Sequence, residues 1–580
     1  MGMLSRIPEY LWIYPSINSQ FSNAIIKEFS IHPLIAQILV SRGFSSMEEI
    51  HRYFYSTLPK LHDPYLLTDM DKAVERVIKA IDDGENIFVY GDNDVDGMTG
   101  TALLTDFFTS IGAKSFFFVP NSNATRQDII TNALVSALQN ECTLLITVDC
   151  GTTAFVEIEQ ITQKNIDVIV TDHHEPVDKI PCCVAILNPK LADSLYPNRE
   201  LTGVGVAFKL AHAITNALVA RGKLRRKNVD LKQYLDLVAM GTISDMGALR
   251  GENRILVKYG IKQLHKGQRV GLTKLFRVCG LDFAAVSSGD VSSKLAPRLN
   301  SLGRIADPMK GVELLLVNKD ADEAQVMALE FDVLNTKRQR IEREVQNDVD
   351  EMMVKNPELF DAKAIVLHSS CWHPGVIAIV ATRLTKQYNR PTIIIAVDNG
   401  IGKGSIRSIS QFPLLPALKK QEHLLMNFGG HDFAAGLTIK EENIDEFKKN
   451  FIGMANEVLM ANDIVCKLRI DAKVDFKELT FDLMDSMALM HPYGNENPSP
   501  ILYVSVMQVR PPKIISKIHM KMYFIQGDRL LEGIAFGMAY RALSLRKKDL
   551  MLRVAFSPQI NTFQNKSSIQ LLIRDFKVLS

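Results

Sequence analysis

The sequence predicts an α/β protein built around a doubly wound parallel sheet, and two observations lead to this prediction. Between about residues 70 and 250, helical stretches alternate with short β-branched runs, as in sheets wrapped by helices. Each run is apolar on both faces: NIFVYGDND, SFFFVPN, TLLITVDCG and DVIVTDHHE. All but SFFFVPN end in acidic residues, His, Cys or Gly. In such sheets, ligands bind beyond the carboxyl ends of the strands.

The rest of the 580-residue chain is long enough for further domains. Residues 322–355 are typical of one long polar helix that connects two lobes, because its apolar positions share a face: Ile341, Val345, Val349 and Met352. Beyond it, KAIVLHSS, RPTIIIAVDNG and GLTIKEEN predict a second α/β domain, with glycine-rich strings between or before its strands. After about residue 465, alternating strands predict a small antiparallel barrel.

Composition narrows the class of protein without identifying a function. With 47% hydrophobic and 23% charged residues and no apolar run near the roughly 18 that a membrane span needs, we expect no transmembrane helix. Pro8, Glu9 and Pro15 interrupt any signal-peptide core, so we expect a cytoplasmic protein. A formal net charge of +2 means that a nucleic-acid partner needs a local basic groove.

Acidic residues and histidines gather at the ends of the predicted elements. They are Asp92, Asp94 and Asp96 in YGDNDVDG, Asp149 in VDCG, Asp172, His173 and His174 in TDHHE, and Asp245 in GTISDMG. Carboxylate oxygens and imidazoles are ligands that Mg²⁺ and Mn²⁺ accept. Asp94 and Asp96 stand two apart at a strand end, where alternation aims both side chains the same way. Taken singly, each aspartate is equally typical of a turn or helix cap; four such sites together favour a metal centre.

These motifs carry a family resemblance. GDNDVDG, VDCG, TDHHEP and SDMGAL, in that order, resemble the four motifs of the DHH phosphoesterases. Further strings between about residues 70 and 440 resemble the RecJ branch: LTGVGVAFKLAHAI, ENRILVKYGIKQL, APRLNSLGRIADPMKGVELLL, CWHPGVIAIVATRL, GKGSIRSIS and GGHDFAAGLTI. HPYGNENPSP followed by HMKM resembles the RecJ oligonucleotide-binding domain.

The resemblance implies a domain plan and a metal site. The expected parts are an N-terminal extension packing on the catalytic core (1–70), a DHH catalytic domain (71–320), a connector helix (321–355), a DHH-associated substrate-binding domain (356–455) and an OB-like nucleic-acid-binding barrel (465–580). Two divalent ions, Mg²⁺ or Mn²⁺, would be held by Asp94, Asp96, Asp149, His173 and Asp245. Asp149 or Asp245 would bridge the ions, while Asp92 and His174 would lie beside the reacting phosphate.

Three strings are candidates for binding DNA phosphates. GKGSIRSIS offers Lys403, Ser405 and Arg407 at alternating positions of a glycine-rich loop, GGHDFAAG offers Gly429, Gly430 and His431, and APRLNSLGR offers Arg298, Asn300 and Arg304. The alternatives are an ordinary turn for the first string, and helix capping and interdomain salt bridges for the third. The resemblance favours DNA contact for all three.

The chain departs from the family pattern at a few positions. Tyr90 stands where DHH pyrophosphatases have a metal-binding histidine, which supports the RecJ branch. Asn93 replaces the usual aromatic residue, a change that alters packing without removing a ligand. Ser122 stands where the family has an arginine, and a Gly-Tyr-Gly element is missing nearby; Arg126 is a candidate replacement for the lost charge.

By resemblance, the activity is 5′-to-3′ hydrolysis of single-stranded DNA in recombination and repair, beside a repair helicase and a single-strand-binding protein. We expect a monomer without membrane contact. One rival is a DHH enzyme for short RNA, pyrophosphate or cyclic dinucleotides, against which the long connector and barrel argue. The other is an inactive scaffold, against which the full set of carboxylates argues.

Overall fold

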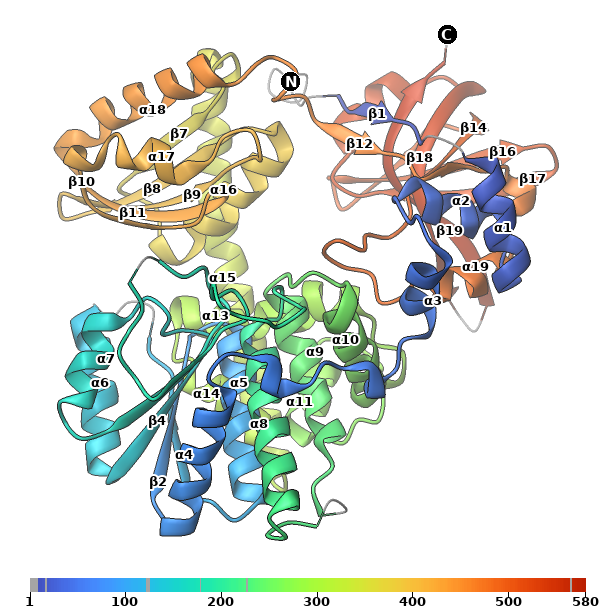
Figure 1. The fold of residues 1–580 in the computed structure, drawn as a ribbon. Coiled ribbons are helices and arrows are strands. Elements are labelled where there is room, and N and C mark those ends of the chain that lie inside the picture. Colours follow the sequence, from blue (N-terminus) through green and yellow to red (C-terminus); the bar gives the residue numbers. More distant parts are fainter. Residues whose placement is uncertain are drawn as a thin grey trace. The chain divides into compact units, whose positions relative to one another are not determined.

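A computed structural model describes residues 9–15, 18–121, 126–177, 179–225, 228–563 and 566–579, without the side chains of 126–130 and 563. The chain forms two compact units (Figure 1). The catalytic unit comprises residues 55–340 and 492–498, and the second unit comprises residues 1–54, 341–491 and 499–580.

The catalytic unit contains a five-stranded, fully parallel sheet in the order β3-β2-β4-β5-β6. Its strands are β2 (Asn86–Gly91), β3 (Ser115–Phe118), β4 (Cys142–Val148), β5 (Asp167–Thr171) and β6 (Ala185–Leu187). From β2 the chain moves outward to β3 and then returns to the other side of β2 as β4. The strand order reverses between β2 and β4, which confirms the predicted doubly wound sheet and marks where a ligand is expected.

Helices cover both faces of this sheet because its strands are apolar on both faces. Ile87 and Val89 of β2 point into the core that includes α4 (Met70–Asp83), α5 (Val95–Ser110) and α8 (Gly203–Ala220). Phe88 points to the opposite core, formed with α6 (Arg126–Gln139) and α7 (Phe155–Thr162). The remaining helices of eight residues or more in this unit are α9 (Leu235–Ser244), α10 (Gly251–Leu264), α11 (Val270–Val278), α13 (Ala296–Ile305) and α14 (Met309–Leu316).

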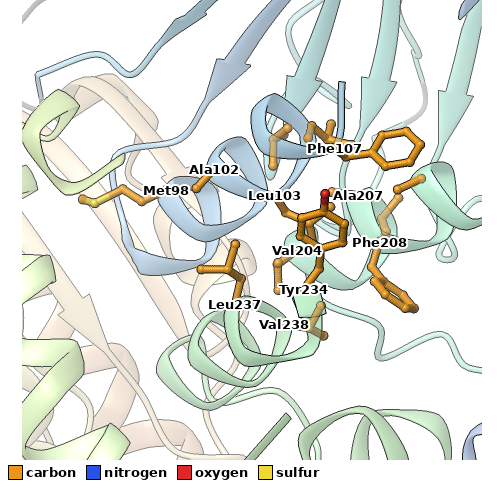
Figure 2. Close-up of a cluster of buried hydrophobic side chains, with 14 of the residues drawn as sticks. Met98, Ala102, Leu103, Phe107, Val204, Ala207, Phe208, Tyr234, Leu237 and Val238 are labelled. Atoms are coloured by element: carbon orange, nitrogen blue, oxygen red, sulfur yellow. The ribbon is translucent and has the colours of Figure 1, made fainter. Parts of the chain in front are cut away.

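Three helices of this core, α5, α8 and α9, pack against one another. Figure 2 shows side chains of α5, α8 and α9 packed together, including Phe107, Val204 and Leu237. Each fully buried side chain of this size contributes roughly 1.5–3 kcal/mol relative to exposure, so the helix ends have fixed positions. Among the described residues, α8 is the one helix long and apolar enough to cross a membrane, and 72% of it is buried.

The helix α15 (Ala321–Lys355) confirms the predicted connector. Beyond it, a sheet in the order β10-β11-β9-β8-β7 contains β7 (Ile365–Ser369), β8 (Thr392–Asp398), β9 (Ile401–Arg407), β10 (Leu425–Gly430) and β11 (Ala434–Lys440). Its helices are α16 (Pro374–Tyr388), α17 (Leu414–Lys419) and α18 (Ile444–Val458). The predicted loop in GIGKGSIRSIS is wrong: this string is β9, paired on both sides. Gly402 and Gly404 occur there because a Cβ would lie 2.7 Å from Ile395 and Leu437 side-chain atoms, respectively.

The C-terminal domain is a closed barrel, as predicted, but it is not wholly antiparallel. Its sheet contains β13 (Ala472–Lys473), β14 (Leu502–Gln508), β15 (Lys513–Ile515), β16 (His519–Gln526), β17 (Arg529–Ala535), β18 (Leu550–Phe563) and β19 (Lys566–Val578). The order β14-β18-β19-β17-β16 closes through a pairing between β14 and β16, while β17 and β19 are parallel. The helix α19 (Phe481–Ala488) precedes these barrel strands. Five strands in one closed circuit are typical of the OB-fold.

The prediction that residues 1–70 pack on the catalytic core holds for residues 55–70, which belong to the catalytic unit, but not for the described residues before them. Residues up to Phe54 belong to the second unit: β1 (Leu11–Ile13) pairs with β12 (Lys467–Arg469), and α1 (Ser19–Phe29), α2 (Pro33–Ser41) and α3 (Met47–Tyr55) follow. Trp12 is buried against the barrel and its Nε1 donates to Asp575 at 2.6 Å. Arg42 just after α2 forms an ion pair with Asp471 at 2.9 Å. An indole and a guanidinium with buried partners hold this segment on the barrel.

Candidate functional site

The acidic residues and histidines meet at the carboxyl edge of the catalytic sheet, beside the reversal between β2 and β4. Asp92 follows the last residue of β2, Asp149 follows β4, and Asp172 and His173 follow β5. Asp245 arrives from another direction, at the C-terminal end of α9. The sequence therefore predicted the right edge of the sheet.

Asp94 and Asp96 converge for a reason other than the predicted strand alternation. The strand ends at Gly91, and Asp94 caps the N-terminus of α5, accepting hydrogen bonds from Asp96 N at 2.8 Å and Gly97 N at 3.1 Å. Asp96 lies in the first turn of that helix and is fully buried. The N-terminus of α5 orients and stabilises the Asp94 carboxylate. Asp94 is thus both a helix cap and a member of the acidic cluster.

His173 lies at the centre of the cluster. Its Nε2 is 3.0 Å from Asp149 Oδ1, 3.5 Å from Asp245 Oδ2 and 3.8 Å from Asp96 Oδ2. Asp149 has a φ of 63°, a conformation that few non-glycine residues adopt. Its backbone N donates to Thr171 O, which fixes the turn that aims its carboxylate at His173.

His174 belongs to a second hydrogen-bonded pair. Its Nδ1 is 2.7 Å from Asp172 Oδ1, and Asp172 also accepts hydrogen bonds from the backbone N–H groups of His173 and Thr152. Asn188 donates to His174 O at 2.8 Å. The hydrogen bond to Asp172 raises the pKa of His174 to about 9, which keeps the imidazole cationic at neutral pH.

Two glycines that the sequence analysis missed allow helix backbones to lie directly against the carboxylates of Asp149 and Asp96. A Cβ on Gly203, at the start of α8, would lie 2.5 Å from Asp149 Cβ, and one on Gly241, in α9, would lie 2.6 Å from Asp96 Oδ1. The backbone N–H groups of Gly203 and Val204 donate to the Asp96 carboxylate at 2.7 and 3.0 Å. The string LTGVGV contains this signal, since a helix N-terminus with glycine allows close approach to an anion.

The crowded carboxylates have strongly perturbed protonation. Burial, followed by the charge of Asp94, raises the pKa of Asp92 to about 7, and the same two causes raise the pKa of Asp245 to about 7. Burial and the neighbouring aspartates raise the pKa of Asp96 and of Asp149 well above the usual range. Carboxylates that are buried close together repel one another, so they tend to bind protons, or metal cations in place of those protons.

The donor set fits divalent metal ions. Three groups each offer ligand atoms within 4.8 Å of one another: Asp149, His173 and His174; Asp96, His173 and Asp245; and Asp92, Asp94 and Asp149. Asp149 Oδ1 is buried and accepts no hydrogen bond from any described residue. A buried carboxylate oxygen without a donor, surrounded by other carboxylates and an imidazole, is suited to Mg²⁺ or Mn²⁺.

The string APRLNSLGR forms α13, which packs on the metal motif. Asn300 Oδ1 accepts a hydrogen bond from Val95 N at 3.2 Å, and a Cβ on Gly303 would lie 2.1 Å from Asn93 O. Arg298 forms an ion pair with Asp332 at 2.7 Å, and Arg304 is half-buried in the last turn. Protein contacts therefore account for both residues: Asn300 binds the first turn of α5, as helix capping predicted, whereas the ion pair of Arg298 lies within the catalytic unit and not between domains.

The loop at residues 122–125, where the sequence departs from the family pattern, lies outside the described residues. Ser122 belongs to this loop, and Arg126 begins α6 without a described side chain. Tyr90, at the end of β2, stacks on Phe118 of β3 at a centroid distance of 6.2 Å. It packs in the hydrophobic core between the sheet and helices α6 and α7.

The second α/β domain presents the other predicted residues on one sheet. Lys403, Ser405 and Arg407 alternate along β9 and share a face. Ser405 pairs with Gly436 of β11, which pairs in turn with Gly429 of β10, so small residues cross three strands. A Cβ on Gly429 would meet nothing within 4 Å. The backbone is accessible along this row, which we call the glycine strip (Ser405, Gly436 and Gly429).

Gly430 and His431 have a different place, at the hairpin between β10 and β11. Gly430 has a φ of 138° and its Cβ would lie 2.4 Å from Ala434 O, so the turn requires glycine. His431 N donates to Ala434 O at 2.8 Å and closes the hairpin.

Comparisons with known proteins match three parts of the chain to described families. Residues 86–242 match the DHH family, N-terminal domain; residues 361–457 match the DHHA1 domain; and residues 470–575 match the RecJ OB domain. These matches cover the catalytic sheet, the sheet with the glycine strip and the barrel.

Sequence similarity to individual relatives extends over nearly all of this chain, including all three parts. The single-stranded-DNA-specific exonuclease RecJ of Bacillus subtilis is 32% identical over 559 residues, covering 96% of this chain and 69% of the relative. The RecJ of Escherichia coli is 32% identical over 555 residues, covering 93% and 95%.

Solved structures agree with the sequence relatives. A structure of RecJ from Thermus thermophilus in complex with Mn²⁺ has a TM-score of 0.79 at 28% identity, covering 98% of this chain and 79% of that one. A structure of the same protein in complex with Mg²⁺ has a TM-score of 0.75 at 27% identity, covering 98% and 78%. The chain belongs to the RecJ family of single-stranded-DNA-specific exonucleases.

Proposed function

We propose that this protein is a metal-dependent exodeoxyribonuclease that hydrolyses single-stranded DNA from its 5′ end. The observation that carries the proposal is the meeting of Asp94, Asp96, Asp149, His173 and Asp245 at one sheet edge, with His173 Nε2 within 3.8 Å of three carboxylates. Membership of the RecJ family supports the substrate and the reaction class.

We assign these five residues as ligands of two divalent ions, Mg²⁺ or Mn²⁺. Asp149 is suited to bridging because its atoms belong to two of the three candidate ligand groups. When bound, the ions supply a water of lowered pKa as nucleophile and neutralise charge in the transition state. Asp96 and Asp94 are already oriented by backbone N–H groups, so binding requires little reorganisation.

We assign phosphate contact to His174 and Asp92. The imidazole of His174 is cationic because Asp172 stabilises its charge, and it is half-exposed, with 45% of its side chain accessible. Its Nε2 is therefore able to donate a hydrogen bond to a phosphate oxygen. Asp92, with a pKa raised by burial to about 7, lies in the same acidic cluster and is suited to accept a proton.

For DNA binding, we propose Lys403, Ser405, Arg407, Gly429, Gly430 and His431 as phosphate-contacting residues. The glycine strip exposes backbone between Lys403 and Arg407, which permits close approach of a phosphate to N–H groups and cations. We extend the proposal to Arg304, Arg298 and Asn300. The last two have protein partners, which DNA must replace.

The OB barrel is proposed to bind further nucleotides of the same strand, as such barrels do through basic grooves and stacking surfaces. We also propose 5′-to-3′ polarity, action as a cytoplasmic monomer in recombination and repair, and cooperation with a helicase and a single-strand-binding protein. Each of these proposals rests on the family alone.

Digestion of end-labelled single-stranded and duplex DNA with Mg²⁺ or Mn²⁺ tests the function, with Asp149→Ala as the comparison. The proposal predicts mononucleotides released from the 5′ end of single strands by the wild type and none by the variant. Absence of cleavage on any DNA by the folded wild type contradicts it, and short RNA and cyclic dinucleotides then become the substrates to test.

A further inference from the structure

A short segment late in the chain, residues 492–498, packs within the catalytic unit. It is a closed turn: Gly494 N donates to Asn497 O at 2.9 Å, and Asn497 N donates back to Gly494 O at 3.2 Å. Asn497 Nδ2 also donates to Pro492 O at 2.7 Å, and Asn497 is buried. The segment therefore has a defined shape of its own.

Asn495 of this segment forms hydrogen bonds to the turn that follows α9, residues Met246–Leu249. Its Nδ2 donates to Met246 O at 2.6 Å, and its carbonyl O accepts from Leu249 N at 3.0 Å. Gly494 lies so close that a Cβ would be 2.5 Å from Leu249 Cδ1. One residue thus binds both ends of the Met246–Leu249 turn.

Other contacts anchor the segment to neighbouring helices. Ser288 Oγ donates to Tyr493 O at 2.6 Å, and Arg254 Nη1 lies 3.4 Å from Pro492 O. Arg250 and Glu496 form an exposed ion pair at 3.2 Å. These contacts anchor the segment to the neighbouring helices, while Asn495 hydrogen-bonds to the turn after α9.

Asp245 directly precedes that turn, and its carboxylate lacks the backbone hydrogen bonds that support Asp94 and Asp96. Asp94 and Asp96 each accept two backbone hydrogen bonds, whereas no described residue donates a hydrogen bond to the Asp245 side chain. The direction of Asp245 therefore depends on the backbone that follows it. That backbone is unusual, since Met246 has a φ of 57°.

The opposite side of the turn is also confined. A Cβ on Gly247 would lie 2.6 Å from Thr202 Cγ2, and Thr202 is the N-cap of the helix whose first N–H groups bind Asp96. The turn therefore lies between the helix that orients Asp96 and the segment that contains Asn495. A shift of either neighbour changes the separation of two carboxylates.

We infer that Asn495 is a positioning residue for Asp245: by holding the Met246 carbonyl, it fixes the Asp245 carboxylate where the second metal ion binds. The inference rests on the proposed function for the metal centre. It assigns a role in the catalytic unit to a segment that precedes the barrel by only a few residues.

Titration of the metal-free, full-length protein with Mn²⁺, followed by electron paramagnetic resonance of the free ion, tests this inference without measuring activity. We expect two ions in the wild type and, in Asn495→Ala, one ion bound about 10-fold more weakly, as for other residues that orient metal ligands. Asn495→Asp keeps the shape but loses the donor. Because an added carboxylate attracts cations, weaker binding in this variant reports the lost hydrogen bond.

Arg250→Ala is the matched control, because it removes a contact of the same segment without touching the Met246 carbonyl, and it should bind both ions normally. Thermal unfolding in a chelator identifies folded variants. Wild-type Mn²⁺ affinity in folded Asn495→Ala overturns the inference. A wild type that binds two ions but cleaves no single-stranded DNA overturns the proposed function and leaves this inference standing.

Discussion

The catalytic sheet and the sheet of the second α/β domain both place glycines beside their functional side chains, but the glycines have different surroundings. Gly203 and Gly241 are buried, and an added Cβ would lie within 2.6 Å of Asp149 and Asp96 side-chain atoms. Gly429 and Gly436 are exposed and have no atom closer than 3.8 Å to such a Cβ. Gly203 and Gly241 allow helix backbones to contact the carboxylates, whereas Gly429 and Gly436 leave the backbone of a sheet exposed to solvent.

The difference in charge follows the difference in burial. The catalytic edge gathers acidic groups whose pKa values rise because they are buried together, so it attracts cations. The glycine strip lies between Lys403 and Arg407 and is suited to anions. Glycine thus serves a metal centre in one sheet and a proposed phosphate surface in the other, and only the surroundings tell the two uses apart.

The largest expected effect separates the two kinds of glycine. Gly203→Ala should lower kcat/KM for a 5′-labelled oligonucleotide by about 100-fold, because a displacement of about 1 Å at a reacting centre has this effect. Gly429→Ala has space for a methyl group in the folded sheet but covers backbone at the proposed phosphate surface, so it should lower kcat/KM only by about a few-fold. Equal losses in the two variants contradict the contrast.

Metal ions should stabilise the catalytic unit more at high pH. The pKa of Asp92 and of Asp245 is raised from 3.8 to about 7, so the metal-free protein loses stability as pH rises from about 4 to about 7. Mn²⁺ at about 100 times its Kd should add about 2.7 kcal/mol at pH 8, and less at pH 5.5, where protons occupy the site. Thermal unfolding with and without Mn²⁺ measures this; equal stabilisation at both pH values contradicts it.

Removing the partner of His174 should shift the pH dependence of cleavage. The wild type should retain a cationic imidazole up to about pH 9, whereas in Asp172→Asn the pKa of His174 should return toward its ordinary 6.5. We expect about a 10-fold loss of kcat at pH 8, less than the roughly 100-fold that loss of a complete general acid causes, because part of the imidazole stays cationic, and a smaller loss at pH 6. An unchanged alkaline limb in the variant excludes this role for His174.

The smallest expected effect concerns the basic residues beside the glycine strip. Arg407→Ala should weaken single-stranded DNA binding a few-fold and reduce the slope of log K against log salt by about 0.7, the value for one phosphate contact on a single strand. Arg383→Ala, which removes an arginine of α16 that is paired with Glu342, is the control and should leave the slope unchanged. If the slopes for Arg407→Ala and the wild type are identical, Arg407 does not contact a DNA phosphate.

Much of the fold was predictable from the sequence because strand periodicity and strand-end acidic residues are local signals. The ends of β2, β4 and β5 and the connector α15 follow from such patterns. The string GIGKGSIRSIS was interpreted as a loop, because the sequence does not show that Gly404 makes room for Leu437 on a neighbouring strand. A short run of alternating residues between glycines fits either structure.

The residues that were missed act at long range. Gly203 meets Asp149 across 54 positions of sequence, and Asn495 reaches Met246 across 249. The place of the N-terminus also depends on a distant partner, since Trp12 donates to Asp575. Sequence spacing and composition predict none of these contacts. They do predict the candidate metal ligands, because Asp and His residues at the ends of helices and strands can be recognised from the sequence.

Anomalous diffraction from crystals of the protein grown with Mn²⁺ tests the central claim most directly. The account predicts two peaks about 3.5–4 Å apart, the usual separation in two-metal phosphoesterases, with Asp94, Asp96, Asp149, His173 and Asp245 as ligands and Asp149 or Asp245 between them. A single peak, or ions bound away from the edge between β2 and β4, contradicts it.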